Sequence, residues 1–445
     1  MDICRRRAMG LGAGLAVGAG LGALTACSSR AAAGEIGDPT KGAIKVWSWA
    51  GPAAEMRALV PEFTRLNPGI GVEVQDIGNP AIWDKITTSM AANGAGIADV
   101  LHIGVDYLPA YTARFPGQLA DLRTLGADKY RTAFAEGLWR TVSMDGSRVD
   151  ALPWEANSGG FYYRRDVFED AGVDADALGT WDDVVEAGLR IKKKTGKYLL
   201  GIDKPASQPD SANLFQMLLQ LQGTMYFDLD GAIMVDSPEA VRAMTLIKRM
   251  NDAGLVSDIS GGWNALISSI KSGTAAVLPW PTWFGGVIEE SVPDQAGLWG
   301  VRLPPAVRRG GTNAATVNST HLAVSGTSRH QGAAWKFVEY VLTRPRVQVR
   351  IYRNKGIAPA LMAAYEDPVF HQPSAFFGGQ RKGEVFLEAL KAGSPAFNYT
   401  SDYARALKAV TDAQTRVLLK GADPATELRR AADQLAAQTA REVAR

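Results

Sequence analysis

The chain has little of several things that would point to catalysis or to nucleic-acid binding. Its 445 residues include two cysteines and four histidines, and the formal net charge is only +2. Phosphate recognition needs clustered basic surface, so this balance argues against a nucleic-acid partner. The patterns HExxH, GxSxG and Walker A are missing, and no histidine pair has metal-ligand spacing. We therefore expect no metal and no cofactor, and we interpret His102, inside an apolar run, as a core histidine.

The N-terminus carries a long hydrophobic run, the only stretch long enough to approach membrane-spanning length. Arginines at 5–7 precede the uncharged segment 8–26, which ends in Leu-Thr-Ala before Cys27. This ending resembles the lipobox of bacterial lipoproteins, in which the cysteine takes a diacylglycerol. We expect a signal peptide at 1–26, lipidation of Cys27 and a flexible tether over 27–42. The arginines fit export by Tat or by Sec, and the run alone would also fit a transmembrane anchor.

The hydrophobic pattern then alternates between strands and helices. Short apolar runs at 44–47, 70–74 and 100–103 predict strands, and the stretches between them have helical spacing. Connections of this length join parallel strands through right-handed crossovers, so we expect an α/β fold. Ligands of such sheets bind beyond the carboxyl ends of the strands. The residues that follow the three strands at that edge are Trp49, Asn79 and Asp106.

The second half of the chain shows helix-start and turn signals. Thr180 before two acidic residues, and Ser237 before Pro238, are typical of capped helix starts. Asp230 and Gly231 between short apolar runs predict a hairpin turn rather than a calcium site. The pattern continues with strands near 277 and 322 and ends in two helices.

Tryptophan placement is the positive functional signal. Among 11 tryptophans, we expect Trp83, Trp181 and Trp335 in core helices, whereas five others fall at strand ends or in loops with Gly and Pro. A sugar has apolar C–H faces and polar hydroxyls, so it suits an indole flanked by hydrogen-bonding side chains. Burial of about 100 Å² against one indole contributes roughly 2.5 kcal/mol, so two or three indoles together with a few Asp, Asn or Glu hydrogen bonds reach the roughly 8 kcal/mol of micromolar binding. The loop tryptophans are Trp49, Trp154, Trp263, Trp280 and Trp283.

A series of short motifs, each weak alone, also runs through the chain in order. They are ADV at 98–100, ALP at 151–153, TWD at 180–182, DSPEA at 236–240, GAAWKF at 332–337 and GIAP at 356–359. In this order and spacing the chain resembles the extracellular solute-binding proteins of ABC importers, in the carbohydrate branch that includes the maltodextrin-binding protein.

The resemblance implies a two-lobe periplasmic-binding-protein-like α/β fold, with crossing hinge segments and a central ligand cleft. It implies a first lobe at 43–154 and 319–358 and a second lobe at 155–318 and 359–445. The segments expected to cross between the lobes are Pro153–Ser158, Thr316–His321 and Gly356–Leu361.

The resemblance also implies which side chains face the ligand. Asp106 corresponds to a hydroxyl-binding acid of the maltodextrin-binding relatives. Asn398 stands where those relatives carry a stacking tryptophan, which argues against maltodextrin as the ligand. The full expected set is Trp49, Asn79, Asp106, Trp154, Glu155, Asn157, Asp210, Trp263, Trp280, Trp283 and Asn398.

Together these features predict a lipid-anchored solute-binding protein on the extracytoplasmic face of a bacterial cell membrane. We expect a monomer, not an enzyme, that captures a mono- or oligosaccharide and delivers it to the permease subunits of an ABC importer. One alternative is a carrier of a non-sugar polar metabolite such as a glycerophosphodiester. Another is a secreted glycoside hydrolase that uses Asp106 and Glu155, whose carboxyl groups would then lie about 5–9.5 Å apart.

Overall fold

The computed structural model describes most of the chain beyond the N-terminal segment. Cys27, the predicted signal peptide and most of the predicted tether lie outside the described residues. In the part that is described, no helix combines the length and the apolar character needed to cross a membrane. The described ranges are 37–143, 146–206, 209–317, 319–393 and 397–444.

A five-stranded mixed sheet combines strands from distant parts of the sequence. Three predicted strands, β1 (Gly42–Ser48), β2 (Ile70–Asp76) and β3 (Val100–Gly104), are parallel neighbours in the order β2-β1-β3. Next to β3 lie β10 (Thr320–Val324) and then β4 (Leu152–Pro153), and β10 runs antiparallel to both. The α/β pattern predicted from residues 44–103 is therefore confirmed.

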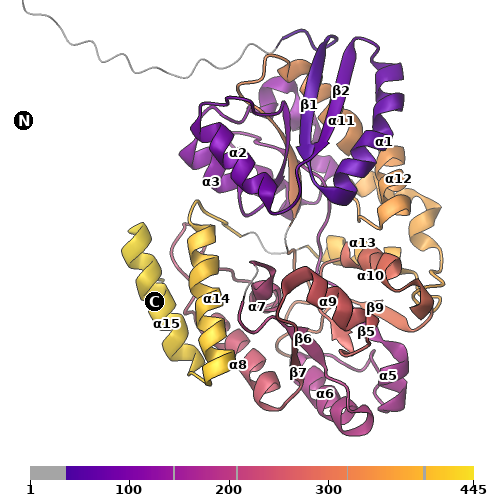
Figure 1. Ribbon diagram of the computed structural model, residues 1–445, viewed down its shortest axis with the longest axis vertical. Helices are drawn as coiled ribbons and strands as arrows, with labels where there is room; N and C mark the ends of the chain where they lie inside the picture. Colours follow the sequence, from indigo (N-terminus) through magenta and orange to yellow (C-terminus); the bar gives the residue numbers. More distant parts are fainter. Residues whose placement is uncertain (1–36, 144–145, 207–208, 318, 394–396, 445) are drawn as a thin grey trace, which may run out of the picture. The chain divides into compact units, whose positions relative to one another are not determined.

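Helices α1 (Ala50–Leu66) and α2 (Ala81–Ala91) form the connections between these parallel strands. The predicted apolar face of α1 is buried at Met56, Leu59 and Phe63. Leu66, the last residue of the helix, is 40% exposed. Helix α11 (Gln331–Leu342) packs against α1 and against β1 and β10, and α12 (Pro345–Lys355) follows it (Figure 1).

A second group of elements is built around two smaller sheets. The three-stranded sheet has the order β8-β5-β9, and a two-stranded sheet pairs β6 with β7 in parallel. The bounds of these strands are β5 (Phe161–Arg164), β6 (Leu200–Ile202), β7 (Val256–Asp258), β8 (Val277–Leu278) and β9 (Trp299–Arg302).

The predicted helix caps are present in this second group. The Thr180 side chain accepts a hydrogen bond from the backbone of Asp183, whose own carboxylate binds the Thr180 backbone N–H, so α6 (Trp181–Thr195) begins with a capping box. Ser237 caps α8 (Pro238–Asp252) in the predicted way. Asp228 N–H donates to the carbonyl of Ala232, which confirms the hairpin turn around 230–231.

The remaining helices are divided between the two groups, and α3 and α4 pack with the five-stranded sheet. As predicted, the chain ends in two helices, which pack against each other (Figure 1). The bounds are α3 (Leu108–Arg114), α4 (Glu136–Val142), α5 (Arg165–Asp170), α7 (Asn213–Gln220), α9 (Gly262–Lys271), α10 (Phe284–Ser291), α13 (Lys382–Ala392), α14 (Tyr403–Lys420) and α15 (Pro424–Thr439).

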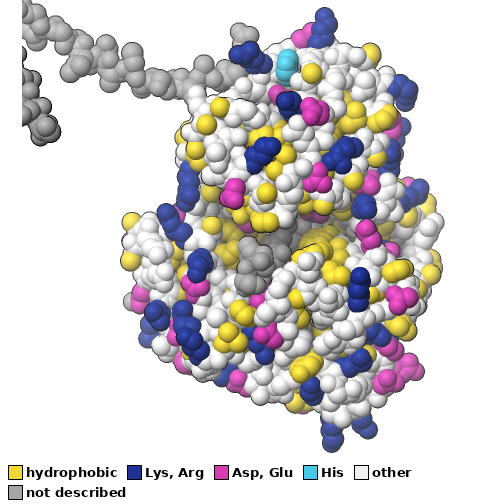
Figure 2. Space-filling view, in the orientation of Figure 1, with side chains coloured by type: hydrophobic (Ala, Val, Ile, Leu, Met, Phe, Trp, Pro, Cys, Tyr) yellow, Lys and Arg dark blue, Asp and Glu magenta, His cyan; other side chains and the backbone are white. Residues whose placement is uncertain are grey.

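The described residues bury two large hydrophobic clusters. One surrounds the five-stranded sheet and extends to Tyr162 and Phe284. The other surrounds α6, α7, α8, α14 and α15 and includes Trp181, which is fully buried as expected of a core helix residue. On the surface, charged side chains of both signs are scattered, whereas hydrophobic ones gather toward the middle of the face that Figure 2 shows.

Candidate ligand-binding site

Three of the predicted ligand residues follow the carboxyl ends of neighbouring parallel strands. Because β1 and β2 pair in register along their whole length, Trp49 and Asn79 leave the sheet at the same edge. Asp106 leaves beside them, two residues beyond the end of β3 at Gly104. Asn79 is exposed, and its Oδ1 accepts a hydrogen bond from Nε1 of Trp83 at 3.1 Å. The edge predicted from the strand order therefore carries an indole, an amide and a carboxylate.

Trp49 belongs to a set of half-buried rings that we call the first aromatic row: Trp49, Trp83 and Tyr107. The indoles of Trp49 and Trp83 meet edge to face, with their ring centroids 5.3 Å apart. Trp83 in turn stacks on Tyr107 at 4.5 Å with an interplanar angle of 12°. The row forms a partly exposed aromatic surface beside Asp106.

Trp83 lies in a helix, as predicted, but at the margin of the core: its side chain is half-buried and packs against the core cluster. The buried positions of α2 are Ile82, Ile86 and Met90, which are spaced four residues apart. Around the helix Trp83 points about 20° away from Met90, at the edge of the buried stripe. Its spacing to Ile86 and Met90 is also helical, which is why periodicity alone did not separate it from the core.

A chain of buried polar side chains lies behind Trp49. The Trp49 indole stacks on the His102 imidazole at 4.0 Å, with an angle of 18°. His102 Nδ1 lies 2.8 Å from Ser48 Oγ, and its Nε2 lies 2.9 Å from Thr320 Oγ1. Thr320 Oγ1 donates to Glu155 Oε1 at 2.7 Å. His102 is fully buried, which confirms its interpretation as a core histidine with satisfied hydrogen bonds.

Burial perturbs both titratable members of this chain. It raises the pKa of Glu155 to about 7, against the opposing effect of hydrogen bonds from Thr320 and Asn157. Burial also holds the pKa of His102 well below its usual range, with a smaller contribution from His321, so the imidazole is neutral. Near neutral pH, the site thus contains a neutral histidine and a carboxyl group that gains or loses its proton.

Three of the predicted ligand residues, Trp154, Glu155 and Asn157, lie in the first of the segments expected to cross between lobes. Trp154 is 1% exposed, and its ring tilts against His102 at 5.2 Å. The Ala156 N–H donates to the carbonyl of Ala358, and the backbone carbonyl of Asn157 accepts from the Val317 N–H. The segments that were expected to cross therefore lie side by side in the described structure.

The other predicted tryptophans form a second aromatic group: Trp263, Trp280 and Trp283, packed on Phe284. Trp263 is 44% exposed and stacks on Trp283 at 6.0 Å, with an angle of 21°. Trp280 stacks on the buried ring of Phe284 at 4.7 Å. Trp263 was expected in a loop but lies in the first turn of α9, which begins directly after Gly261 and its positive φ of 114°.

Backbone hydrogen bonds tie this second group to the crossing segment. The Gly160 N–H donates to the carbonyl of Trp280, and the Thr282 N–H donates to that of Ser158, each at 2.9 Å. A Cβ at position 160 would lie 2.9 Å from the same Trp280 oxygen, so glycine allows this approach. The chain segment that begins with Trp154, whose ring packs on His102 behind Trp49, therefore also anchors the second group.

Asp106 lies within electrostatic reach of tyrosines near the C-terminal helices. The pKa values of Tyr399 and Tyr403 are raised mainly by burial and additionally by the charge of Asp106. Nearby, Asn398 Nδ2 donates to the Leu229 carbonyl and its Oδ1 accepts from the Thr400 N–H, so this amide fastens the hairpin to the 397–400 segment.

Asp210 and metal-ligating clusters remain to be placed among the candidate sites. Asp210 lies in the short 3-10 turn Pro209–Ala212, and its side chain lies outside what the structure describes. Across the described ranges, no group of three or more His, Cys, Asp or Glu is arranged to hold a metal ion.

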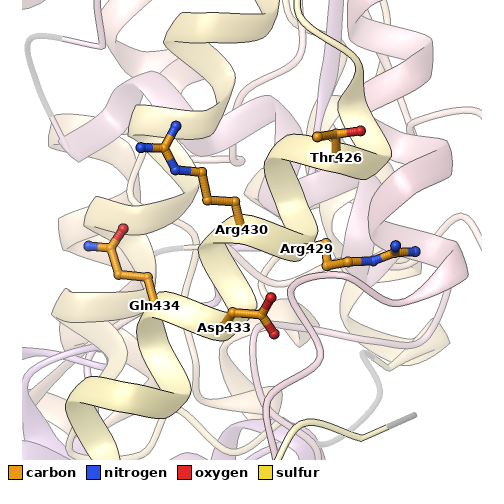
Figure 3. Close-up of a pocket in the computed structure, with 5 residues that line it drawn as sticks. All are labelled: Thr426, Arg429, Arg430, Asp433 and Gln434. Atoms are coloured by element: carbon orange, nitrogen blue, oxygen red, sulfur yellow. The ribbon is translucent and has the colours of Figure 1, made fainter.

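A hollow along α15 is a different kind of surface. In Figure 3, the side chains of Arg430 and Gln434 point to one side of the helix, and those of Arg429 and Asp433 to the other. With Thr426 these residues line the hollow, and none of the five is aromatic. It therefore lacks the apolar platforms expected for a sugar site.

Comparisons with known proteins identify relatives along most of the chain. A lactose-binding protein from Rhizobium radiobacter is 26% identical over 422 residues, covering 93% of this chain and 94% of the relative. An arabinooligosaccharide-binding protein from Halalkalibacterium halodurans is 24% identical over 365 residues, covering 79% of this chain and 80% of that protein.

The fold is also similar to solved structures. An ABC-transporter-associated binding protein from B. animalis subsp. lactis, solved with β-1,6-galactobiose, matches with a TM-score of 0.75 and 24% identity. The match covers 89% of this chain and 97% of that one, which confirms the periplasmic-binding-protein-like fold.

The family profile for bacterial extracellular solute-binding proteins matches residues 47–345, well over half of the chain. The matched region includes both aromatic sets and the buried polar chain from Ser48 to Thr320. Proteins of this family bind solutes rather than transform them, in agreement with the expectation that the chain is not an enzyme. By this match, the chain belongs to the bacterial extracellular solute-binding proteins.

Proposed function

We propose that this protein captures a mono- or oligosaccharide and delivers it to the permease subunits of an ABC importer. The observation that carries the proposal is the arrangement of the two aromatic sets. The first set is linked to the segment that starts at Trp154 through His102, and the second set through backbone hydrogen bonds, while Asp106 lies beside Tyr107 of the first set. Flat apolar rings beside hydrogen-bond acceptors suit the C–H faces and hydroxyls of a sugar.

The ligands of the related proteins support a sugar as the ligand class. The two curated relatives bind lactose and arabino-oligosaccharides, and the solved structure contains a galactobiose. These ligands are uncharged saccharides of at least two sugar units. An oligosaccharide would span more than one ring platform, which agrees with a site built from two aromatic sets.

The side chains divide into platforms and hydrogen-bonding groups. Trp49 and Trp283 are the proposed stacking surfaces, because each is half-buried and held in place by neighbouring rings. Asp106 and Glu155 are the proposed acceptors for sugar hydroxyls, and a protonated Glu155 also donates. Two or three platforms at roughly 2.5 kcal/mol per indole, together with a few hydrogen bonds from these side chains, offset the cost of association.

Binding would select one arrangement of two lobes. We assign the first lobe to 43–154 and 319–358 and the second to 155–318 and 359–445. A ligand that contacts both lobes favours the closed form by its differential affinity, and the closed form is the one offered to the permease. No chemical step is required, and a monomer suffices.

The decisive experiment is calorimetric titration against lactose, arabinotriose, β-1,6-galactobiose and maltotriose. Trp283→Ala is expected to weaken the best binder about tenfold or more, because about 1.4 kcal/mol is a factor of ten. The matched control is Leu419→Ala, which removes apolar surface from a residue that is 51% exposed on α14, away from the aromatic sets. Unchanged affinity in Trp283→Ala would contradict the proposed platform.

The same titration separates the ligand classes. Glycerophosphocholine serves as a non-sugar polar probe, and heat from it without heat from any sugar would overturn the sugar assignment. Chromatography of each sugar after incubation is expected to show no products.

We further propose that the chain is exported, by Tat or by Sec, and anchored through Cys27. The support is the Leu-Thr-Ala-Cys ending of the hydrophobic N-terminal run. In a bacterial host, the full-length protein is expected in the membrane fraction with a diacylglyceryl mass on Cys27. Cys27→Ser is expected to lose that mass, and a wild-type protein without it would refute the anchor.

A further inference from the structure

The stacking of Trp49 on His102 joins a proposed ligand platform to a buried hydrogen-bond chain. The centroids of the two rings are 4.0 Å apart and nearly parallel, so the imidazole supports the rear face of the indole. Behind it, His102 is held by Ser48 on one nitrogen and by Thr320 on the other. The position of the indole thus depends on buried side chains behind it.

We infer that His102 is a positioning residue for Trp49, held by a hydrogen-bond chain that runs from Ser48 through His102 and Thr320 to Glu155. The inference rests on the proposed function in assigning Trp49 a role in sugar binding. It concerns a residue that touches no ligand and acts through the ring in front of it.

The direction of this chain follows from counting donors. An ionised carboxylate only accepts, so Thr320 gives its single hydroxyl proton to Glu155. Thr320 must then accept from Nε2–H of His102, and Nδ1 accepts from the hydroxyl of Ser48. When Glu155 is protonated, its own O–H can donate to Thr320 Oγ1, so Thr320 no longer has to donate to Glu155. Thr320 can then donate to Nε2 of His102, which allows the imidazole tautomer with the proton on Nδ1.

The indole of Trp49 therefore senses the proton on Glu155. Burial raises the pKa of Glu155 to about 7, so the change falls in an accessible pH range. The other titratable groups on elements packed against the 154–158 segment are His102 on β3, Asp106 beyond its end and His321 on β10. Burial lowers the pKa of both histidines, well below the usual range for His102 and to about 3 for His321, so both are neutral near neutral pH.

The test uses the full chain labelled with 5-fluorotryptophan, with the Trp49 ¹⁹F resonance assigned by Trp49→Phe. No ligand is needed. The Trp49 resonance of the wild type is expected to shift between about pH 5 and about pH 9, with a midpoint near the pKa of Glu155. Thr320→Val, which keeps the shape of the side chain and removes its hydroxyl, is expected to abolish this shift, and Glu155→Gln is expected to do the same.

Thr411→Val is the matched control. Thr411 is also buried, and its hydroxyl donates to the Lys408 carbonyl within α14, away from the hydrogen bonds that link Ser48 to Glu155. It is expected to keep the wild-type pH response. A Trp49 resonance that does not respond to pH in the wild type, or that responds unchanged in Thr320→Val, would overturn the inference, even if Thr320→Val lowers the unfolding temperature.

Titration of the same variants with lactose and β-1,6-galactobiose separates this inference from the proposed function. If the resonance responds as expected and a sugar binds, Thr320→Val is expected to weaken binding about fivefold and to flatten its pH profile. If the resonance responds and neither sugar binds, the positioning of Trp49 is supported and its role in binding these sugars is overturned.

Discussion

Replacement of Glu155 by glutamine tests the electrostatics of the site through protein stability. The Glu155 carboxyl is 8% exposed and accepts a hydrogen bond from Thr320. Glutamine has nearly the same shape, and its carbonyl can accept the same bond. The substitution therefore removes the titratable proton while it keeps the packing.

The size of the effect follows from the pKa. Burial raises the pKa of Glu155 from 4.5 to about 7 in the folded protein. Each tenfold difference in proton affinity is worth about 1.4 kcal/mol, so ionisation of the buried carboxyl costs the folded state about 3 kcal/mol. This cost is absent at low pH, where the folded and the unfolded chain both hold the proton.

The sign of the pH dependence is fixed by which state binds the proton more tightly. Between the two pKa values, the folded protein keeps a proton that the unfolded chain has released. The free energy of unfolding contributed by Glu155 therefore falls as the pH rises through this window and levels off above the folded pKa. Glu155→Gln is neutral throughout and lacks this fall.

Urea unfolding of the wild type and of Glu155→Gln at about pH 4.5, 6 and 8 measures the effect. The difference between the two proteins is the informative quantity, because other titrating groups cancel in it. Relative to the wild type, the variant is expected to gain about 3 kcal/mol between the lowest and the highest pH. A difference that stays constant with pH would refute the reasoning.

Glu339→Gln provides a control of opposite sign. Burial opposes ionisation of Glu339, but hydrogen bonds from Lys129 and Tyr130 outweigh it and lower the pKa. The stability that this carboxylate contributes is therefore lost as the pH falls, and the variant is expected to lose stability relative to the wild type at high pH.

Three further substitutions test separate parts of the account. Trp83→Ala is expected to weaken sugar binding about tenfold in calorimetry with little change in unfolding temperature, because Trp83 belongs to the half-buried first row; a large drop in stability would restore the core interpretation. Thr180→Ala removes the hydroxyl that caps Asp183 N–H and is expected to cost about 1 kcal/mol in urea unfolding, so an unchanged midpoint would contradict the capping box. Gly286→Ala would drive a methyl group into the carbonyl of Lys355 and is expected to cost about 2 kcal/mol in the same assay; a neutral effect would mean that the two backbones separate easily.

Local features of the fold were accessible from the sequence. The caps at Thr180 and Ser237 and the hairpin at 230–231 depend on residues within a few positions of one another, and all three are present. The strand ends at Trp49 and Asp106 were also predictable, because the strand–helix pattern determines which edge of a parallel sheet collects them.

Contacts between distant segments were not accessible in the same way. Thr320 meets Glu155 across 165 residues and His102 across 218, and these distances close only when β10 pairs between β3 and β4. The partial exposure of Trp83 was not predicted for a different reason: Trp83 points only about 20° away from Met90 around the helix, a difference that hydrophobic periodicity does not resolve.

A crystal structure with the tightest-binding sugar tests the central claim most directly. The account predicts that one sugar ring stacks on Trp49 or Trp283 and that a sugar hydroxyl contacts Asp106 or Glu155. A sugar bound elsewhere, for example in the hollow along α15, with both indoles untouched, would contradict it.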